Sequence, residues 1–206
     1  MLSGTAMQTR IILPLLALFA LPIGAKAQRP SQSGLGYMGG PQVATWHSEA
    51  VNYRPVAGFV AGIYVPIWAG RFFEIQPDLL LSLQGAAQDL PEDGRSTMRN
   101  LRAILPVSLK MFLGQTFNLQ AGVQGGYLVM AKADGRDIKD QVSPLDMGIN
   151  IGAGIGTTTG LDLTLRYYSG LTNTLVEDSH FFPSNRTLQF TAGYRFMQFS
   201  RQRRRH

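Results

Sequence analysis

The sequence predicts an all-β protein in which eight antiparallel strands form an up-and-down barrel. Three observations support this fold class. Apolar and polar residues alternate along most of the chain, long polar connections alternate with short turns, and no helical periodicity follows the N-terminal leader. The segment RTLQFTAGYRF, residues 186–196, shows the alternation clearly: Leu188, Phe190, Ala192, Tyr194 and Phe196 are separated by polar or small residues. Such a strand has one apolar and one polar face, because successive side chains point to opposite sides.

Residues 1–27 are expected to be a cleaved signal peptide. Arg10 precedes an uncharged run at 11–25, and the AKAQ that follows offers a cleavage site after Ala27. A membrane anchor is disfavoured, because the run is shorter than the roughly 20 residues of a spanning helix and contains Pro14 and Pro22. The barrel is then assigned to residues 28–196 and a basic tail to residues 197–206.

The expected strands follow one another along the mature chain. Two weaker ones come first, and six with clear alternation follow; their ranges are 35–45, 55–67, 72–84, 101–111, 117–129, 147–155, 161–168 and 186–196. Tight turns are expected at 68–71, 113–116 and 156–160, and long polar loops at 46–53, 89–96, 133–143 and 173–185. An up-and-down barrel has this parity, with short turns at one rim and long loops at the other. An even strand count returns the chain to its starting side, which predicts that both termini are periplasmic if the barrel lies in an outer membrane.

The polar faces decide between two barrels of opposite polarity. A soluble lipocalin-like barrel turns its apolar face inward, whereas an outer-membrane barrel turns it toward lipid. The polar faces hold four acids and four bases, a balanced set that suits a packed interior because buried charges need partners. This predicted ion-pair network of the lumen consists of Glu74, Asp78, Arg102, Lys110, Asp146, Asp162, Arg166 and Arg195. The same faces are rich in glycine, which fits a narrow lumen, and the membrane barrel is therefore favoured.

The apolar faces are mostly aliphatic and carry aromatic residues nearer the strand ends. Such a pattern is typical of the aromatic girdles that flank the apolar band of a membrane barrel. The predicted girdle residues are Phe117, Tyr127, Tyr167, Tyr194 and Phe196. The sequence thus predicts a transmembrane β-barrel whose first partners are outer-membrane lipids.

Composition excludes several functions. The chain has no cysteine, so disulfides and thiol catalysis are excluded. The formal charge of +6 comes largely from the tail, since residues 28–196 hold equal numbers of acids and bases, and nucleic acid is not an expected partner. The EDSHFF segment places Asp178, Ser179 and His180 together, but neighbours in sequence do not make a catalytic triad. No catalytic residue, cofactor or metal site is assigned.

The strand motifs EIQPDLLLSLQGA, LRAILPVSLKM, FNLQAGVQGGYLV, LDLTLRYYSGLTN and LQFTAGYRF resemble those of the PorT-like family of bacterial outer-membrane β-barrel domains, over residues 34–196. The resemblance implies an eight-stranded barrel in the outer membrane of a Gram-negative bacterium and provides no catalytic residue. We expect an interaction or structural protein that acts through its loops or its periplasmic rim. Two alternatives stay open: a component of secretion machinery, with a periplasmic or secretion-complex partner, and a lipid-modifying enzyme.

Overall fold

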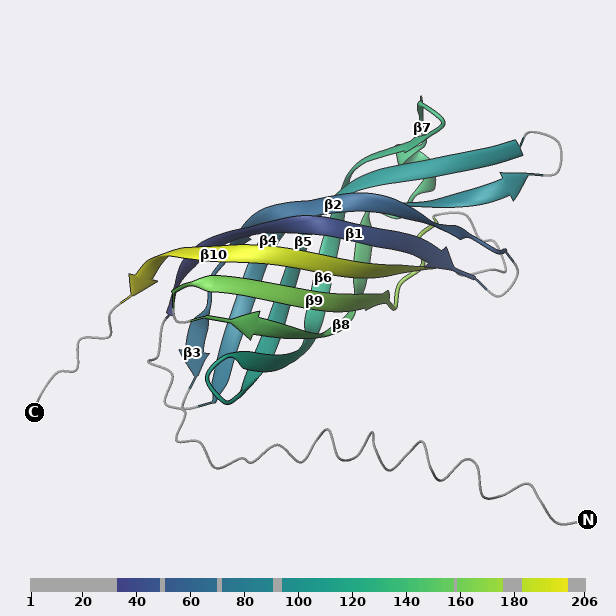
Figure 1. The fold of residues 1–206 in the computed structure, drawn as a ribbon. Helices are drawn as coiled ribbons and strands as arrows, with labels where there is room; N and C mark the ends of the chain where they lie inside the picture. The colour runs from purple at the N-terminus through teal and green to yellow at the C-terminus, as the bar shows by residue number, and fades with distance from the viewer. Residues whose placement is uncertain are drawn as a thin grey trace, which may run out of the picture.

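The computed structural model is a closed antiparallel β-barrel, and it describes residues 33–48, 51–69, 72–90, 94–157, 159–175 and 183–199 (Figure 1). Eight long strands form the ring in the order β2-β1-β10-β9-β8-β6-β5-β4, and β2 pairs with β4 to close it. These strands are β1 (Ser33–His47), β2 (Arg54–Tyr64), β4 (Phe73–Leu90), β5 (Gly94–Leu113), β6 (Phe117–Ala133), β8 (Leu145–Gly156), β9 (Leu161–Gly170) and β10 (Ser184–Phe199). The predicted eight-stranded up-and-down barrel is therefore confirmed.

The two ends of the barrel differ in their connections. We call the end at which residues 114–116 connect β5 to β6 the turn side. The opposite end, at which residues 134–144 connect β6 to β8, is the loop side. β1 begins and β10 ends on the turn side, where Ser33 is paired with Phe199. β10 ends at Phe199, so the last strand extends three residues beyond the barrel boundary at 196 that was assigned from the sequence. The leader 1–27 and residues 200–206 lie outside the described residues.

One predicted long loop is wrong. Residues 89–96 were expected to form a polar loop, but β4 and β5 continue through this region and pair as far as Leu90 and Gly94. The resulting two-stranded ribbon projects beyond the neighbouring strands on the loop side (Figure 1). Sequence reasoning missed it because the flanking residues GAAQDL and GRSTMRN lack apolar alternation: outside the membrane, neither face of the ribbon needs to be apolar.

Two other predicted elements differ in detail. The expected strand 55–67 is interrupted after Tyr64, and the short β3 (Ile67–Ala69) then pairs with β4. Pro66 lies in the break and has no N–H to contribute to a ladder. The expected loop 133–143 contains β7 (Arg136–Asp137) and a single 3-10 turn, η1 (Lys139–Gln141). β7 pairs with the end of β6 through a tight turn in which Asp134 and Gly135 have φ values of 48° and 86°.

The apolar faces point outward, as the membrane barrel requires. Val123 is 62% exposed and Ile151 is 56% exposed, whereas their inward-facing neighbours Gln124 and Asn150 are buried. A soluble barrel with an apolar interior is thereby excluded. Among the described residues, no helix is long and apolar enough to cross a membrane.

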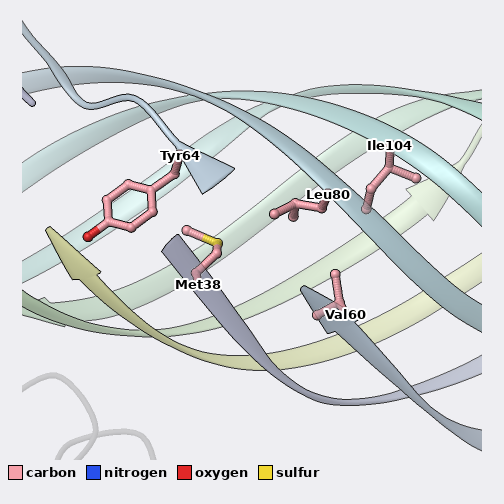
Figure 2. Packing of buried hydrophobic residues seen from close by; sticks show 5 residues of the cluster. All are labelled: Met38, Val60, Tyr64, Leu80 and Ile104. Carbon is pink, nitrogen blue, oxygen red and sulfur yellow. The ribbon is translucent and has the colours of Figure 1, made fainter. Parts of the chain in front are cut away.

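The lumen also contains an apolar cluster that the alternation did not reveal. Met38, Val60, Tyr64, Leu80 and Ile104 pack together inside the barrel (Figure 2). They come from β1, β2, β4 and β5, so this half of the wall is partly apolar while the opposite half is polar. The run LLLSL, residues 79–83, has leucine on both faces of the strand. The alternation of apolar and polar residues therefore does not identify Leu80 as an inward-facing side chain.

A glycine makes room for the ring of Tyr64. A Cβ atom at Gly36 would lie 2.4 Å from Cε1 of Tyr64 and 2.8 Å from the carbonyl oxygen of Tyr194. Any larger residue would push the ring or the strand away. Gly36 therefore leaves the space on β1 that the ring of Tyr64 occupies.

The outward apolar face predicts a depth-dependent response to charge. Leu165 lies in the middle of β9, between Ala153 and Phe190, so Leu165→Arg should lower the free energy of unfolding by about 2–4 kcal/mol in lipid vesicles. Leu171, just past the loop-side end of β9 and 72% exposed, is the matched control, and Leu171→Arg should cost about 0–1 kcal/mol. Urea unfolding followed by tryptophan fluorescence measures both. Equal costs at the two depths would contradict the assignment of a lipid-facing belt.

Candidate functional site

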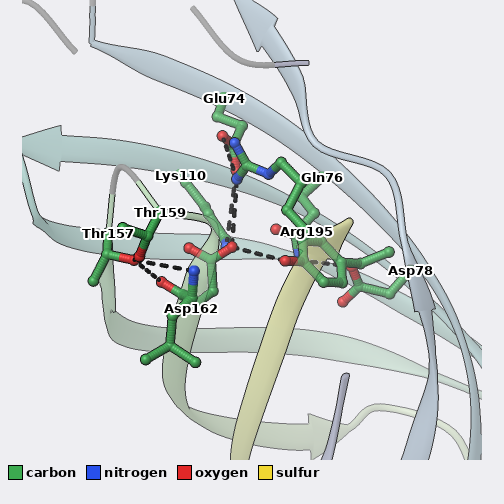
Figure 3. Close-up of polar contacts among 10 residues, drawn as sticks. Glu74, Gln76, Asp78, Lys110, Thr157, Thr159, Asp162 and Arg195 are labelled. Atoms are coloured by element: carbon green, nitrogen blue, oxygen red, sulfur yellow. Dashed lines mark hydrogen bonds and ion pairs between the residues drawn. The ribbon is translucent and has the colours of Figure 1, made fainter. Parts of the chain in front are cut away.

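The turn side of the lumen holds a compact cluster of charges (Figure 3). Glu74 lies between two cations, with Lys110 Nζ 3.8 Å from Oε1 and Arg195 Nη2 3.7 Å from Oε2. The same Arg195 nitrogen is 3.4 Å from Oδ2 of Asp162. All four side chains are buried, and two acids balance two bases. Such balance is what makes buried charge tolerable, because an unpaired ion in this environment costs several kcal/mol.

Tyr64 connects this charged cluster to the apolar one. Its hydroxyl donates a hydrogen bond to Oδ2 of Asp162 at 2.8 Å, while its ring packs in the cluster with Met38. The tyrosine therefore crosses the lumen from β2 to β9. A side chain with an apolar body and one polar tip suits this boundary.

A second ion pair lies further toward the centre. Nη2 of Arg166 is 2.8 Å from Oδ2 of Asp78, and both side chains are almost fully buried. Oδ1 of Asp78 accepts a hydrogen bond from Gln76 at 2.7 Å. The carboxylate is thus held from both sides, by β9 across the lumen and by its own strand.

The last two predicted network residues do not form an ion pair with each other or with the other six. Asp146 accepts hydrogen bonds from Asn185 at 3.1 Å and Thr172 at 3.2 Å. Arg102 Nη2 instead donates to the backbone carbonyl of Ser143 at 3.1 Å. Both side chains are buried near the loop side. The structure therefore brings six of the eight predicted residues into ion pairs and leaves Arg102 and Asp146 in separate hydrogen-bonding contacts.

Amide side chains, which sequence reasoning did not single out, connect the strands in the middle of the lumen. Gln42 donates to Ser82 Oγ at 2.8 Å and accepts from Gln189 at 3.0 Å. Ser82 in turn accepts a hydrogen bond from Gln84 at 2.9 Å. This chain of contacts joins β10, β1 and β4 across the seam where the first and last strands meet. The signal was present in the sequence as recurrent Gln and Asn on the polar faces.

On the loop side, the β6–β8 connection is held by an apolar cluster and by the residues that follow β9. Leu128, Ala131 and Val142 form an apolar cluster, against which Ile138 and Leu175 pack. Val142 and Leu175 form an isolated β-bridge, so the β6–β8 connection is tied to the β9–β10 connection. A hydrogen bond of 2.8 Å from the N–H of Ser143 to the carbonyl of Thr174 reinforces this contact.

A carboxylate fixes the projecting hairpins to each other. Asp134, in the β6–β7 turn, accepts hydrogen bonds from the Ser96 hydroxyl at 2.6 Å and the Thr97 N–H at 3.0 Å. These contacts hold the β6–β7 hairpin against the β4–β5 ribbon. Two open surface depressions lie nearby on the loop side, of about 540 Å³ beside Arg136 and about 330 Å³ beside Arg54.

The five predicted girdle residues all face outward. Phe117, Tyr194 and Phe196 lie toward the turn side, and Tyr127 and Tyr167 toward the loop side. The ring of Tyr37 stacks on Phe196 at a centroid distance of 5.9 Å and lies 6.1 Å from Tyr194. Sequence reasoning missed Tyr37 because the first strand alternates weakly.

The described parts of the chain contain no cluster of candidate catalytic side chains that would support the enzyme hypothesis. His47 is exposed at the end of β1, while Asp178, Ser179, His180 and His206 lie outside the described residues. The glycine-rich segment GAGIG, residues 152–156, could suggest a phosphate-binding loop, but it lies within the strand β8. No group of three or more metal-binding side chains occurs within the described ranges.

Comparisons with known proteins agree with the geometry. Residues 26–176 match the model of a family described as outer membrane protein beta-barrel domain. Neisserial surface protein A is similar in structure, with 12% identity and a TM-score of 0.56 over 80% of this chain and 99% of that one. The attachment invasion locus protein Ail of Yersinia pestis, solved with the heparin analogue sucrose octasulfate, has 12% identity and a TM-score of 0.50 over the same shares. At this identity the likeness concerns the fold. A search of curated proteins found no match.

The buried pair of Asp78 and Arg166 should behave as a coupled unit. Arg166→Leu leaves the carboxylate buried without its cation and should cost about 3–5 kcal/mol of unfolding free energy. Asp78→Leu combined with Arg166→Leu should cost less than the two single changes added together. The exposed ion pair of Arg54 and Asp89 is the control, and Arg54→Leu should cost about 0–1 kcal/mol. Urea titration in vesicles measures the cycle, and additive single costs would refute the coupling.

The contact between the projecting hairpins should depend on pH. The Ser96 hydroxyl, the Thr97 N–H and nearby Arg136 hold the pKa of Asp134 below its usual range. A lowered pKa in the folded state means that this contact stabilises the fold above the unfolded pKa of about 3.9 and is lost as pH falls through the folded pKa. Ser96→Ala should raise the pKa of Asp134 toward its ordinary value. Thr97→Ala, which keeps the backbone donor, should not. Carboxyl-carbon NMR titration reads both, and equal shifts in the two variants would contradict the role of the hydroxyl.

Proposed function

Because the chain belongs to the outer membrane protein beta-barrel domain family, we propose that it is an interaction or structural protein of the bacterial outer membrane. Its barrel anchors the chain in the membrane, and its loops or its periplasmic rim make the functional contacts. This role does not require the finer resemblance to PorT-like proteins. The family match supports the wider group of outer-membrane barrels.

The filled lumen is the observation that carries this proposal. An eight-stranded barrel has an interior just wide enough for side chains to fill it. Here, ion pairs fill the turn side, an amide chain and an apolar cluster fill the middle, and on the loop side the β6–β8 connection packs against Leu128, Ala131 and Leu175. Steady diffusion of solutes would require breaking several of these contacts together. A structural anchor fits this interior better than a pore.

The loop side offers the more elaborate of the two surfaces. The β4–β5 ribbon and the β6–β7 hairpin project from the barrel and are joined through Asp134. A surface held by hydrogen bonds loses little conformational entropy when it binds a partner, which favours recognition. The described parts of the turn side are short connections, such as residues 114–116.

The proposed orientation places the loop side outside the cell and the turn side, with both termini, in the periplasm. The short turns and the paired strand ends at Ser33 and Phe199 support it. Neither a secretion-machinery component nor a lipid-modifying enzyme has a specific observation in its favour among the described residues.

Single cysteines test the orientation and find partners, since the chain has none of its own. Asp140→Cys in η1 should react with a membrane-impermeant maleimide on intact cells, and Gln115→Cys in a short turn should react only after permeabilisation. Both side chains are exposed, so accessibility within the protein is matched.

A photocrosslinker attached at the same two cysteines should capture a partner reproducibly from one side. Cells expressing the cysteine-free protein provide the background. Labelling of Gln115→Cys alone on intact cells would reverse the orientation. Absence of any specific crosslink from either side would contradict the interaction role.

A further inference from the structure

Two basic residues lie side by side on the outer surface of the barrel. Arg99 of β5 and Lys132 of β6 are direct register partners, and both side chains are exposed. Directly opposed residues on one face of an antiparallel pair have Cβ atoms about 4.5–5.5 Å apart. Like charges at this separation repel each other and destabilise the pairing. Such an arrangement calls for an anion to compensate it.

The neighbouring acids compensate the two bases only in part. Among the described residues, neither Arg99 nor Lys132 has a carboxylate within ion-pair distance. Asp137 lies opposite Lys132 in β7 and offsets part of its charge, but it forms no ion pair with either base, and its Oδ1 accepts a hydrogen bond of 2.9 Å from the backbone N–H of Lys139. The nearby Asp89 is paired with Arg54. The two bases therefore stay available to a ligand.

The apolar belt ends directly beneath this pair. Moving along both strands toward the turn side, the next outward register pair is Leu101 with Met130, and Leu83 of β4 pairs with Leu101 on the other side. Two residues along a strand correspond to about 7 Å. The two cations thus lie at the height where acyl chains give way to headgroups.

The distribution of charge around the barrel supports the same placement. Every charged side chain described as exposed belongs to the loop side: Arg54, Asp89, Arg99, Lys132, Asp134, Arg136, Asp137, Lys139 and Asp140. The charged residues nearest the turn side, such as Glu74 and Arg195, are buried in the lumen. Only one boundary of the apolar belt therefore presents charge to a headgroup layer in the described part of the chain.

We propose that Arg99 and Lys132 bind a phosphate of the phosphorylated glycolipid in the outer leaflet, whose acyl chains lie over Leu83, Leu101 and Met130. The guanidinium offers paired donors to the phosphate oxygens and the ammonium adds a compact charge. The inference rests on the proposed orientation, in which the loop side faces outward. It names one lipid class as a specific ligand of one patch of the barrel.

Purified protein in detergent tests the site without cells or orientation. Wild type, Arg99→Gln/Lys132→Gln and the control Lys139→Gln are mixed with lipid A, and the retained lipid is quantified by native mass spectrometry. Because each base near an anionic surface contributes appreciably, the double variant should bind lipid A about tenfold more weakly. Lys139→Gln, which removes an exposed base of η1 away from the pair, should bind like wild type. Arg99→Lys keeps the charge and loses the paired donors, so it should bind lipid A more tightly than the double variant and less tightly than wild type. Gel heat-shift confirms that each variant is folded.

Two further probes identify the ligand. Dephosphorylated lipid A should bind wild type as weakly as lipid A binds the double variant, and inorganic phosphate alone should not compete at millimolar concentration. Equal binding of lipid A to wild type and the double variant, or of the two lipid forms to wild type, would overturn the proposal. Effective competition by inorganic phosphate would overturn the lipid assignment. Cysteine labelling of the wrong side on cells would instead refute the proposed orientation, which this binding measurement does not address.

Discussion

The demand that every backbone N–H and C=O within the hydrocarbon be hydrogen-bonded governs this structure. Lipid offers no partners, so an open sheet edge in the bilayer would cost several kcal/mol for each unpaired group. The pairing of β1 with β10, from Ser33–Phe199 to His47–Ser184, removes the last edge and closes the ring. Closure encloses a lumen, and the lumen must then be filled by the side chains that point inward.

The contents of the lumen follow from that enclosure. Inward positions are too crowded for bulk water, so charges are placed in balanced groups such as Glu74 with Lys110 and Arg195. Amides such as Gln42 and Gln189 hydrogen-bond to one another where charges are absent. The apolar cluster around Leu80 fills the part of the lumen that contains neither ion pairs nor linked amides. A lumen filled in this way holds the wall rigidly, which leaves binding to the outer surfaces.

Outside the bilayer the constraint is relaxed, and the loop side shows the consequence. The β4–β5 ribbon continues as a two-stranded hairpin beyond the neighbouring strands because water can hydrogen-bond its free edges. Asp134 ties the second hairpin to it through Ser96 and Thr97. The exposed charges of the described chain gather here, including the opposed bases Arg99 and Lys132, while the belt below them is aliphatic and aromatic. The loop side thus combines a fixed shape with charge, the two properties that recognition requires.

The sequence by itself determined the fold class, the direction of the strand faces and the inward position of all eight charged residues. These properties are local: side chains alternate along any strand, and a charged residue on the polar face of a barrel strand must point inward. Only the tertiary structure decided which charges meet. Glu74 and Arg195 come from β4 and β10, which do not pair, and their contact depends on how far the strands are staggered around the ring. The same stagger brings Tyr64 to Asp162, whereas Arg102 and Asp146 form no ion pair with each other. The alternation of apolar and polar residues also did not predict the extension of β4 and β5, because strands that pair in water need no apolar face.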